Sequence, residues 1–294
     1  MRFSYRTLVW PAMALLIPAM PLSAETVNET LGMANDGHVL IDNLAGSVEV
    51  SVWDKAEVEI RGELGDDVEE LEISESSNGI RIRVRNSSKS RHIDETELFL
   101  RVPLRAGLEV ETVSADIDVE GSAGKIIRVN TVSGDVDMLG SPQRIDIHSV
   151  SGDVEFEGAV SRSSVETVSG EITLHGLTGE IAVSTVSGDV SLITDEASQA
   201  RFESVSGDVK LELAISDGGR LTSDSMSGDL NLRLPANQEG HFSAQTFSGD
   251  VRSDFGEAAS VSRGPGSLLE YTDGSNGASI RLESFSGDIH IRRQ

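Results

Sequence analysis

The chain has 294 residues, a net charge of −25 from 24 basic and 49 acidic residues, and no cysteine. The missing cysteines exclude disulfides and thiolate metal sites, and the acidic balance disfavours nucleic-acid binding, which depends on Lys and Arg contacts to phosphates. Aromatic residues make up only 4% of the chain, so its core must consist mainly of Val, Ile and Leu.

The first 24 residues have the pattern of a secretory signal peptide. Arg2 and Arg6 give a positive start, an apolar run covers positions 8–22, and small residues end at Ala24. This predicts export and cleavage after Ala24, whereas a membrane anchor needs a longer run of roughly 20 residues. Without the two arginines the net charge changes from −25 to −27. We expect the mature chain, with no transmembrane segment, in the periplasm, on the outer surface or in the medium.

Residues 25–107 alternate between apolar and polar positions without a regular repeat. Alternation over four to eight residues predicts half-buried strands. The stretches that show it are 39–50, 58–61, 79–85 and 98–103. We expect an irregular β region at 25–107 that continues and caps the stack formed by 108–294, because a repeat stack needs a cover at its open end.

From residue 108 onward a six-residue motif recurs. It is degenerate at 112–117 and reads Thr-Val-Ser-Gly-Asp-Val at 131–136. Its glycines stand at 134, 152, 170, 188, 207, 228, 249 and 287, at steps of 18 to 21 residues except for a last step of 38. Each unit also holds two stretches with alternating apolar residues, such as Val136/Met138 and Ile145/Ile147.

Two short strands per repeat unit predict an all-β fold. We expect a single-stranded parallel β-solenoid, similar to a β-helix, with coils of about 18–21 residues and a right-handed course favoured over a left-handed one. A propeller blade would need about twice this repeat length.

Stacking gives each motif position its own column, with coils about 4.8 Å apart. Gly permits the positive φ of a sharp corner, and the flanking Ser and Asp can bind nearby backbone groups. The apolar residue before the Ser-Gly corner is expected to form an interior column. Its members are Val132, Val150, Val168, Val186 and Val205.

The far end of the chain departs from this regularity. The step of 38 between Gly249 and Gly287 is twice 19, which predicts one coil between 250 and 283 that has lost its motif. The last residues, 290–294, are short and basic. Positive charge at the end of the stack would discourage end-to-end association.

The acidic residue after each motif glycine is a candidate metal ligand. Stacked carboxylates supply the hard oxygen ligands that calcium prefers. Two such charges about 4.8 Å apart in water repel by only about 0.9 kcal/mol, so the stack does not require a cation. The alternative is that each carboxylate accepts a backbone N–H bond at its own corner. The candidates are Asp135, Asp153, Asp189, Asp208, Asp229, Asp250 and Asp288.

Other chemistry has little support. No Gly-x-Ser-x-Gly elbow and no phosphate-binding loop with its Lys occurs, so we expect no enzyme, no catalytic residues and no cofactor. The main enzymatic alternative is a polysaccharide-active β-helix enzyme. Its candidate site is the stretch 251–282, which holds Arg263 to Gly266 and Tyr271 to Asp273, because segments free of repeat constraints often carry function.

The chain resembles a bacterial family of β-strand-repeat proteins, the DUF4097 group of "putative adhesins". The matching features are VLIDNLAGSVEVSVWDKAEVEIRGEL at 39–64, LRVP at 100–103 and the tandem Ser-Gly-Asp units. The resemblance implies an exported β-solenoid and brings no catalytic residues.

The sequence thus predicts a non-catalytic scaffold or adhesin-like surface-interaction protein of the bacterial envelope. Its partner would be an envelope or surface macromolecule and not a nucleic acid. One alternative is a calcium-binding or cation-sensing envelope protein that uses the stacked aspartates, and a second is the polysaccharide-active enzyme.

Overall fold

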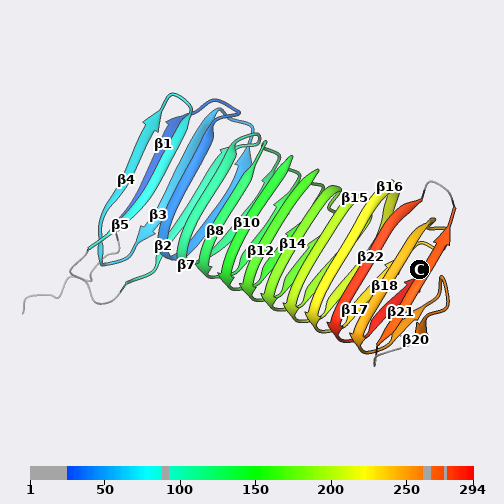
Figure 1. The fold of residues 1–294 in the computed structure, drawn as a ribbon. Helices are drawn as coiled ribbons and strands as arrows, with labels where there is room; N and C mark the ends of the chain where they lie inside the picture. The colour runs from blue at the N-terminus through cyan, green and yellow to red at the C-terminus, as the bar shows by residue number, and fades with distance from the viewer. Residues whose placement is uncertain (1–24, 88–92, 261–265, 275–276) are drawn as a thin grey trace, which may run out of the picture.

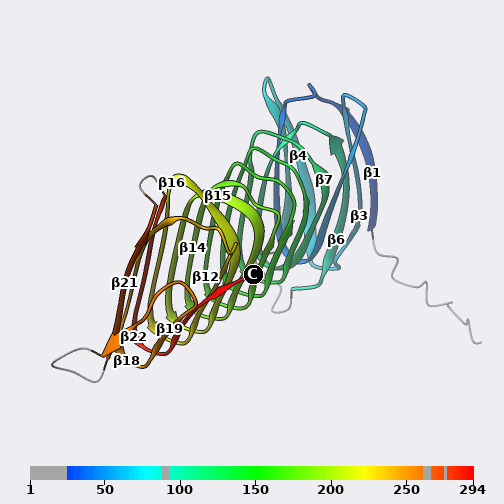
Figure 2. The same ribbon diagram turned by 90° about the vertical axis from the view of Figure 1, so that its right-hand side faces the viewer.

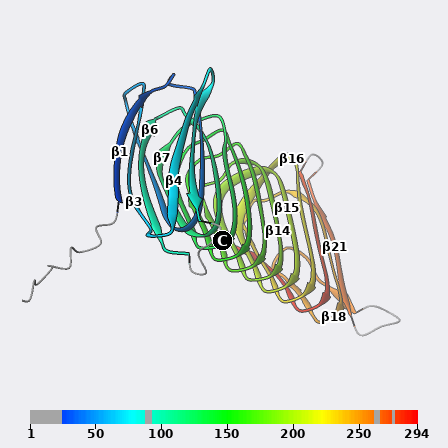
Figure 3. The ribbon, with the colours of Figure 1, turned by 90° about the vertical axis from the view of Figure 1, so that its left-hand side faces the viewer.

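The computed structural model describes residues 25–87, 93–260, 266–274 and 277–294, and these ranges contain 23 strands, β1 to β23. The strands form one long stack that runs from the blue and cyan strands of the N-terminal part to orange strands, with the red C-terminal strands inserted before the orange ones (Figure 1). Views from the two ends show each coil as a flattened ring (Figures 2 and 3). The predicted all-β parallel solenoid is confirmed, whereas its handedness stays a prediction.

Each coil has two sides that meet at the Ser-Gly-Asp corner. We call the strands before this corner the pre-corner sheet and those after it the post-corner sheet. In the middle of the stack, equivalent residues of successive coils pair in parallel. The strands here are β7 (Gly107–Ser122), β8 (Ile127–Ser133), β9 (Val136–Gly140), β10 (Arg144–Ser151), β11 (Val154–Glu157), β12 (Arg162–Ser169), β13 (Ile172–His175), β14 (Gly179–Ser187), β15 (Val190–Ser206) and β16 (Val209–Ser227).

A single hydrophobic core fills the stack between the two sheets. Val136, Met138, Ile145 and Ile147 all point inward, as the alternation predicts. Three phenylalanines on separate coils, of which Phe156 is one, are among its largest fully buried side chains. Val, Ile and Leu supply most of the remainder, so the scarcity of aromatic residues costs the core little.

The predicted interior valine column is wrong, because those valines lie outside. Val132 and its equivalents are 44–48% exposed, while the preceding residue, such as Thr131, is buried. Side chains alternate between the two faces of a strand. Since Ile127 and Val129 point inward on β8, Thr131 must follow them inward and Val132 must point to solvent.

The corner glycines have the predicted backbone conformation. Their φ angles lie between +122° and +155°, a region that side chains with a Cβ rarely enter. The corners also stack closely: a Cβ added to Gly170 would lie 2.1 Å from the carbonyl oxygen of Gly152 on the preceding coil. Glycine is therefore required both by the turn and by the neighbouring coil.

At the N-terminal end the coils do not follow chain order. Strand β2 (His38–Trp53) lies between a coil made of β5 (Gly79–Asn86) and β6 (Thr96–Pro103) on one side and β7 on the other. Three antiparallel strands complete this end: β1 (Glu25–Gly32) pairs with β3 (Glu57–Leu64), β3 with β6, and β4 (Val68–Ser76) with β5. Antiparallel strands thus occupy the edges that the parallel coils would leave open.

The C-terminal end repeats this device. Strands β22 (Ala278–Ser286) and β23 (Ile289–Arg293) form a coil that lies between two others. On one side, β22 pairs with β16 and β23 with β17 (Leu230–Leu234). On the other side, β22 pairs with β18 (Gly240–Ser248) and β23 with β19 (Val251–Ser253). The edge is covered by β21 (Ser267–Asp273), which is antiparallel to β18 and to β20 (Ala259–Ser260).

Two predictions about this end are therefore wrong. The stretch between 250 and 283 does not form a coil that has lost its motif, because β20 and β21 run antiparallel as a cover. The basic C-terminus does not end the stack either, since β23 pairs with a strand on each side. The step of 38 residues arises because the chain first forms the outer coil of β18 and β19 and its cover of β20 and β21. It then returns to form the coil of β22 and β23 inside them.

Candidate interaction surfaces

An exposed apolar column runs along the outer face of the pre-corner sheet, one residue before each corner serine. Its members align through the parallel pairing of neighbouring strands. In spatial order they are Val113, Val132, Val150, Val168, Val186, Val205, Met226, Phe285 and Phe247, each 44–59% exposed. Contiguous exposed apolar surface of this kind marks interaction sites more often than scattered single residues do.

The side chains of the apolar column grow toward the C-terminal end of the stack. Valine gives way to Met226, Phe285 and Phe247, and the two phenylalanine rings stack 5.0 Å apart at 8°. Stacked valines suit strand stability alone, because β-branched residues pack well on a pleated sheet. Phenylalanine also favours strands, but methionine has no such preference, so the stability of the strands does not account for Met226.

A shallow groove of about 600 Å³ lies along this larger end. One wall consists of apolar column residues and the other of the next outward column, which carries Glu203, Asp224 and Glu283. Burial, and then repulsion from Glu283, raises the pKa of Asp224. Glu203 and Glu283 are paired with Arg201 and Arg281, whereas no ion pair among the described residues involves Asp224. The groove therefore combines apolar surface with an acidic wall.

The predicted metal ligands lie on the other side of the apolar column and form an aspartate ladder. The Oδ1 atom of one aspartate accepts a hydrogen bond of 2.8–3.0 Å from the backbone N–H of the equivalent residue one coil away. The ladder comprises Asp116, Asp135, Asp153, Glu171, Asp189, Asp208, Asp229, Asp288 and Asp250. The carboxylates thus bind the neighbouring coil, and not their own corner as the alternative to the metal site supposed.

The ladder has one interruption, at Glu171. The N–H of Glu171 donates to Asp153 at 2.8 Å, but among the described contacts no bond joins the Glu171 carboxylate to the N–H of Asp189. The additional methylene of glutamate moves the carboxylate away from the position that an aspartate occupies.

We expect Glu171→Asp to raise the free energy of unfolding by about 1 kcal/mol, because a hydrogen bond to a charged group is restored. Chemical denaturation of the two proteins measures the difference. Glu166→Asp, an exposed change outside the ladder, serves as the control and should be neutral within about 0.5 kcal/mol. Equal behaviour of the two variants would contradict a stabilising role for the ladder.

Calcium binding by the ladder stays a prediction. Within residues 25–87, 93–260, 266–274 and 277–294, no group of three or more His, Asp or Glu side chains has an arrangement that could hold a metal ion. One oxygen of nearly every ladder carboxylate is already used by a backbone N–H. A cation at the ladder would have to use the second oxygens.

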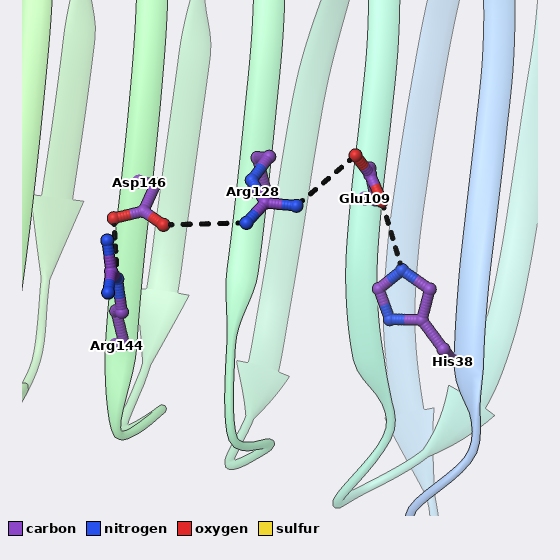
Figure 4. Close-up of polar contacts among 5 residues, drawn as sticks. All are labelled: His38, Glu109, Arg128, Arg144 and Asp146. Carbon is purple, nitrogen blue, oxygen red and sulfur yellow. Dashed lines mark hydrogen bonds and ion pairs between the residues drawn. The ribbon is translucent and has the colours of Figure 1, made fainter.

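A chain of ion pairs crosses the pre-corner sheet near the N-terminal end (Figure 4). His38 Nε2 lies 3.2 Å from Glu109, Arg128 bridges Glu109 at 3.3 Å and Asp146 at 3.9 Å, and Arg144 binds Asp146 at 2.8 Å. Burial alone would raise the pKa of Glu109, but the hydrogen bonds from His38 and Arg128 together lower it. These contacts join four neighbouring strands, β2, β7, β8 and β10, and stabilise the stack.

The candidate enzymatic stretch is only partly described. Positions 261–265, including Arg263, lie outside the described residues. On β21, the Tyr271 ring packs 5.8 Å from Phe242 and its hydroxyl donates to Asp273 at 3.4 Å. Tyr271 is thus partly buried against the core, and the polysaccharide-active enzyme stays a prediction.

The signal-peptide segment 1–24 also lies outside the described residues. Among the residues that are described, no helix is long and apolar enough to cross a membrane.

Comparisons with known proteins match this chain to one family and to several solved structures. Residues 39–216 and 203–292 match the family model described as toastrack DUF4097. Similar solved structures include "putative adhesins" from Bacteroides fragilis (12% identity, TM-score 0.47, 92% of this chain and 98% of that chain covered), Parabacteroides distasonis (10%, 0.44, 91% and 97%) and Parabacteroides merdae (10%, 0.41, 92% and 96%). No relative was found among curated proteins.

Proposed function

Because this chain belongs to the toastrack DUF4097 family, we propose that it is an exported, non-catalytic interaction protein of the bacterial envelope that binds a macromolecular partner along the apolar column. The signal-peptide pattern at 1–24 supports export. Solved structures that are similar to this chain are described as "putative adhesins", and the proposed interaction role is of the same kind.

The single observation that carries the proposal is the apolar column itself. Nine apolar side chains, each 44–59% exposed, lie in register on one face. A strongly acidic chain that needed only solubility would place polar residues there. Large side chains such as Phe247, Phe285 and Met226 are the type that dominates binding energy at protein interfaces.

The charges beside the column define the partner's chemistry. Glu203, Asp224 and Glu283 flank it on one side, and the aspartate ladder flanks it on the other. An anionic lipid surface or a nucleic acid would be repelled. The complementary partner is a protein segment with a row of apolar residues bordered by Lys and Arg, because opposite charges at the rim of an interface favour association.

Site-specific crosslinking tests this directly. A photo-crosslinking amino acid in place of Ser227, which is exposed beside Met226, is introduced into the chain with its own leader, and envelope fractions are irradiated. We expect a mature protein that begins at Glu25 and a crosslinked partner peptide with apolar residues bordered by Lys or Arg. A synthetic copy of that peptide should bind the purified protein in fluorescence polarisation.

The Phe247→Ser/Phe285→Ser double variant should weaken this peptide binding by about 100-fold, since hot-spot residues cost roughly 2 kcal/mol or more when truncated. Leu104→Ser is the matched control, because Leu104 is 45% exposed but lies outside the column. An unchanged affinity of the double variant, or a crosslinked peptide of acidic character, would refute the proposal. Retention of the leader would refute the export part alone.

A further inference from the structure

The outer face of the post-corner sheet separates its charges by position along the stack. The first outward residue of each strand forms one column, aligned by the parallel pairing. From β2 to β19 it reads, in spatial order, Glu49, Asp118, Asp137, Glu155, Thr173, Ser191, Lys210, Asn231, His290 and Arg252, and Phe99 of β6 stands before Glu49. Four acidic positions are thus followed by two neutral ones and then by four basic or polar ones.

The second outward column follows this trend in part. In spatial order it reads Ser51, Glu120, Leu139, Glu157, His175, Ile193, Glu212, Arg233 and Arg292. Its acidic residues stand mainly on the acidic coils of the first column, and its two arginines stand at the opposite end. The basic half contains a groove of about 300 Å³ lined by Lys210, Asn231, Arg233, His290 and Arg292, among others. We call the two regions the acidic half and the basic half of the post-corner face.

Many of these charges form no ion pair within the described part of the chain, although Arg61 and Arg101 line a groove together with Asp118 and Glu120. Among the described residues, no ion pair involves Asp118, Glu120 or Glu155 in the acidic half, and none involves Lys210 or Arg292 in the basic half. Burial, and then repulsion from Glu155 and Asp118, raises the pKa of Asp137. Unneutralised charge of both signs on one face is unexpected in a chain with twice as many acids as bases.

We propose that the post-corner face binds a second copy of this chain, with the acidic half of each copy against the basic half of the other. A two-fold axis parallel to the strands, between β13 and β15, reverses the order of the coils and keeps each column opposite itself. The strand β11 then faces β16, β7 faces β23 and β2 faces β19. An interface of this kind uses the same patch on both copies, as the commonest homodimers do.

This arrangement brings opposite charges together in both columns. In the first column Glu155 faces Lys210 and Glu49 faces Arg252, while Asp118 faces the imidazole of His290. In the second column Glu120 faces Arg292, while Leu139 faces Arg233. A two-fold axis along the stack would instead place the acidic halves against each other, so the charges select one orientation.

The same pattern favours a second copy over a simple ligand. An anionic polymer would fit the basic half but would be repelled by the acidic half, and a cationic segment would meet the reverse problem. A second copy satisfies both halves at once. One repulsive contact, Glu157 against Glu212, is reduced because Glu212 lies 3.5 Å from Arg233 of its own chain. The aspartate ladder lies at the corner, just before the strands of this face begin.

Charge reversal with complementation tests the dimer. Sedimentation equilibrium of residues 25–294 at about 0.1 M salt, where the Debye length is about 10 Å, should show a concentration-dependent dimer. Lys210→Glu and Glu155→Lys should each raise its dissociation constant by at least about tenfold, because each variant creates two like-charge contacts. An equimolar mixture of the two variants should restore the dimer, since every reversed residue then meets an opposite charge.

Arg220→Glu is the matched control, because it makes the same change of charge on the pre-corner sheet and should leave the dimer intact. A monomeric wild-type chain at all concentrations would overturn the proposal. So would a dimer that tolerates both single reversals, or a mixture that stays monomeric. The Phe247→Ser/Phe285→Ser double variant should dimerise normally, which separates this interface from the proposed partner surface.

Discussion

Replacing Gly188 with alanine is expected to lower the free energy of unfolding by about 3 kcal/mol or more, or to prevent folding. The φ angle of Gly188 is +155°, where a residue with a Cβ is strained by about 1–3 kcal/mol. The new Cβ would also lie 2.0 Å from the carbonyl oxygen of Gly170. That oxygen belongs to the backbone of the adjacent coil, so relief requires two stacked corners to separate. Chemical denaturation followed by circular dichroism measures the loss.

Two other glycines separate the causes of this effect. Gly218 has a φ of +70° but no atom within 4 Å of an added Cβ, so Gly218→Ala should cost only about 1 kcal/mol. Gly32 has neither a positive φ nor a close neighbour, and Gly32→Ala should be nearly neutral. If Gly188→Ala cost no more than Gly218→Ala, the close stacking of the corners would not limit the sequence.

Removal of residues 277–294 is expected to damage the C-terminal part of the stack more than a larger truncation does. Strands β22 and β23 form the coil between the one that contains β16 and β17 and the one that contains β18 and β19. Without them, β18 and β19 lose their parallel neighbours, and Phe242, Ala244 and Leu269 lose the core against which they pack. We expect protease cleavage throughout 235–276 and aggregation through the exposed edges.

A chain that ends at Leu234 is the comparison. It lacks β18 to β23 entirely, so its last coil has one open edge but no detached apolar segment. Limited proteolysis and hydrogen exchange should show that 25–234 keeps its core and stays monodisperse longer than 25–276. If 25–276 proved the more resistant chain, the inserted position of β22 and β23 would be incorrect.

Much of the coil can be predicted from the sequence because the repeat acts locally. The inward positions of Val136 and Ile145 follow from alternation over a few residues, and the corner at Gly134 follows from the demand for a positive φ. The apolar column was predicted to lie inside, although the alternation of side chains on β8 shows that it lies outside. Ile127 and Val129 point inward, so Thr131 also points inward and Val132 points to solvent. The apolar character of Val132 suggested burial, but the strand register decided its direction.

The fold class, the length of the coils and the residues of the corners follow from the amino-acid sequence, because these depend on short-range periodicity and on the conformational freedom of glycine. The order of the coils at the two ends does not follow from it and is seen only in the folded chain. The motif at Gly287 shares its Ser-Gly-Asp corner and its pattern of inward residues with the motifs at Gly228 and Gly249, so its backbone bonds and its core side chains fit between them as well as after them. Which slot it fills depends on the antiparallel cover formed by β20 and β21, and such long-range pairing leaves no periodic signal in the chain.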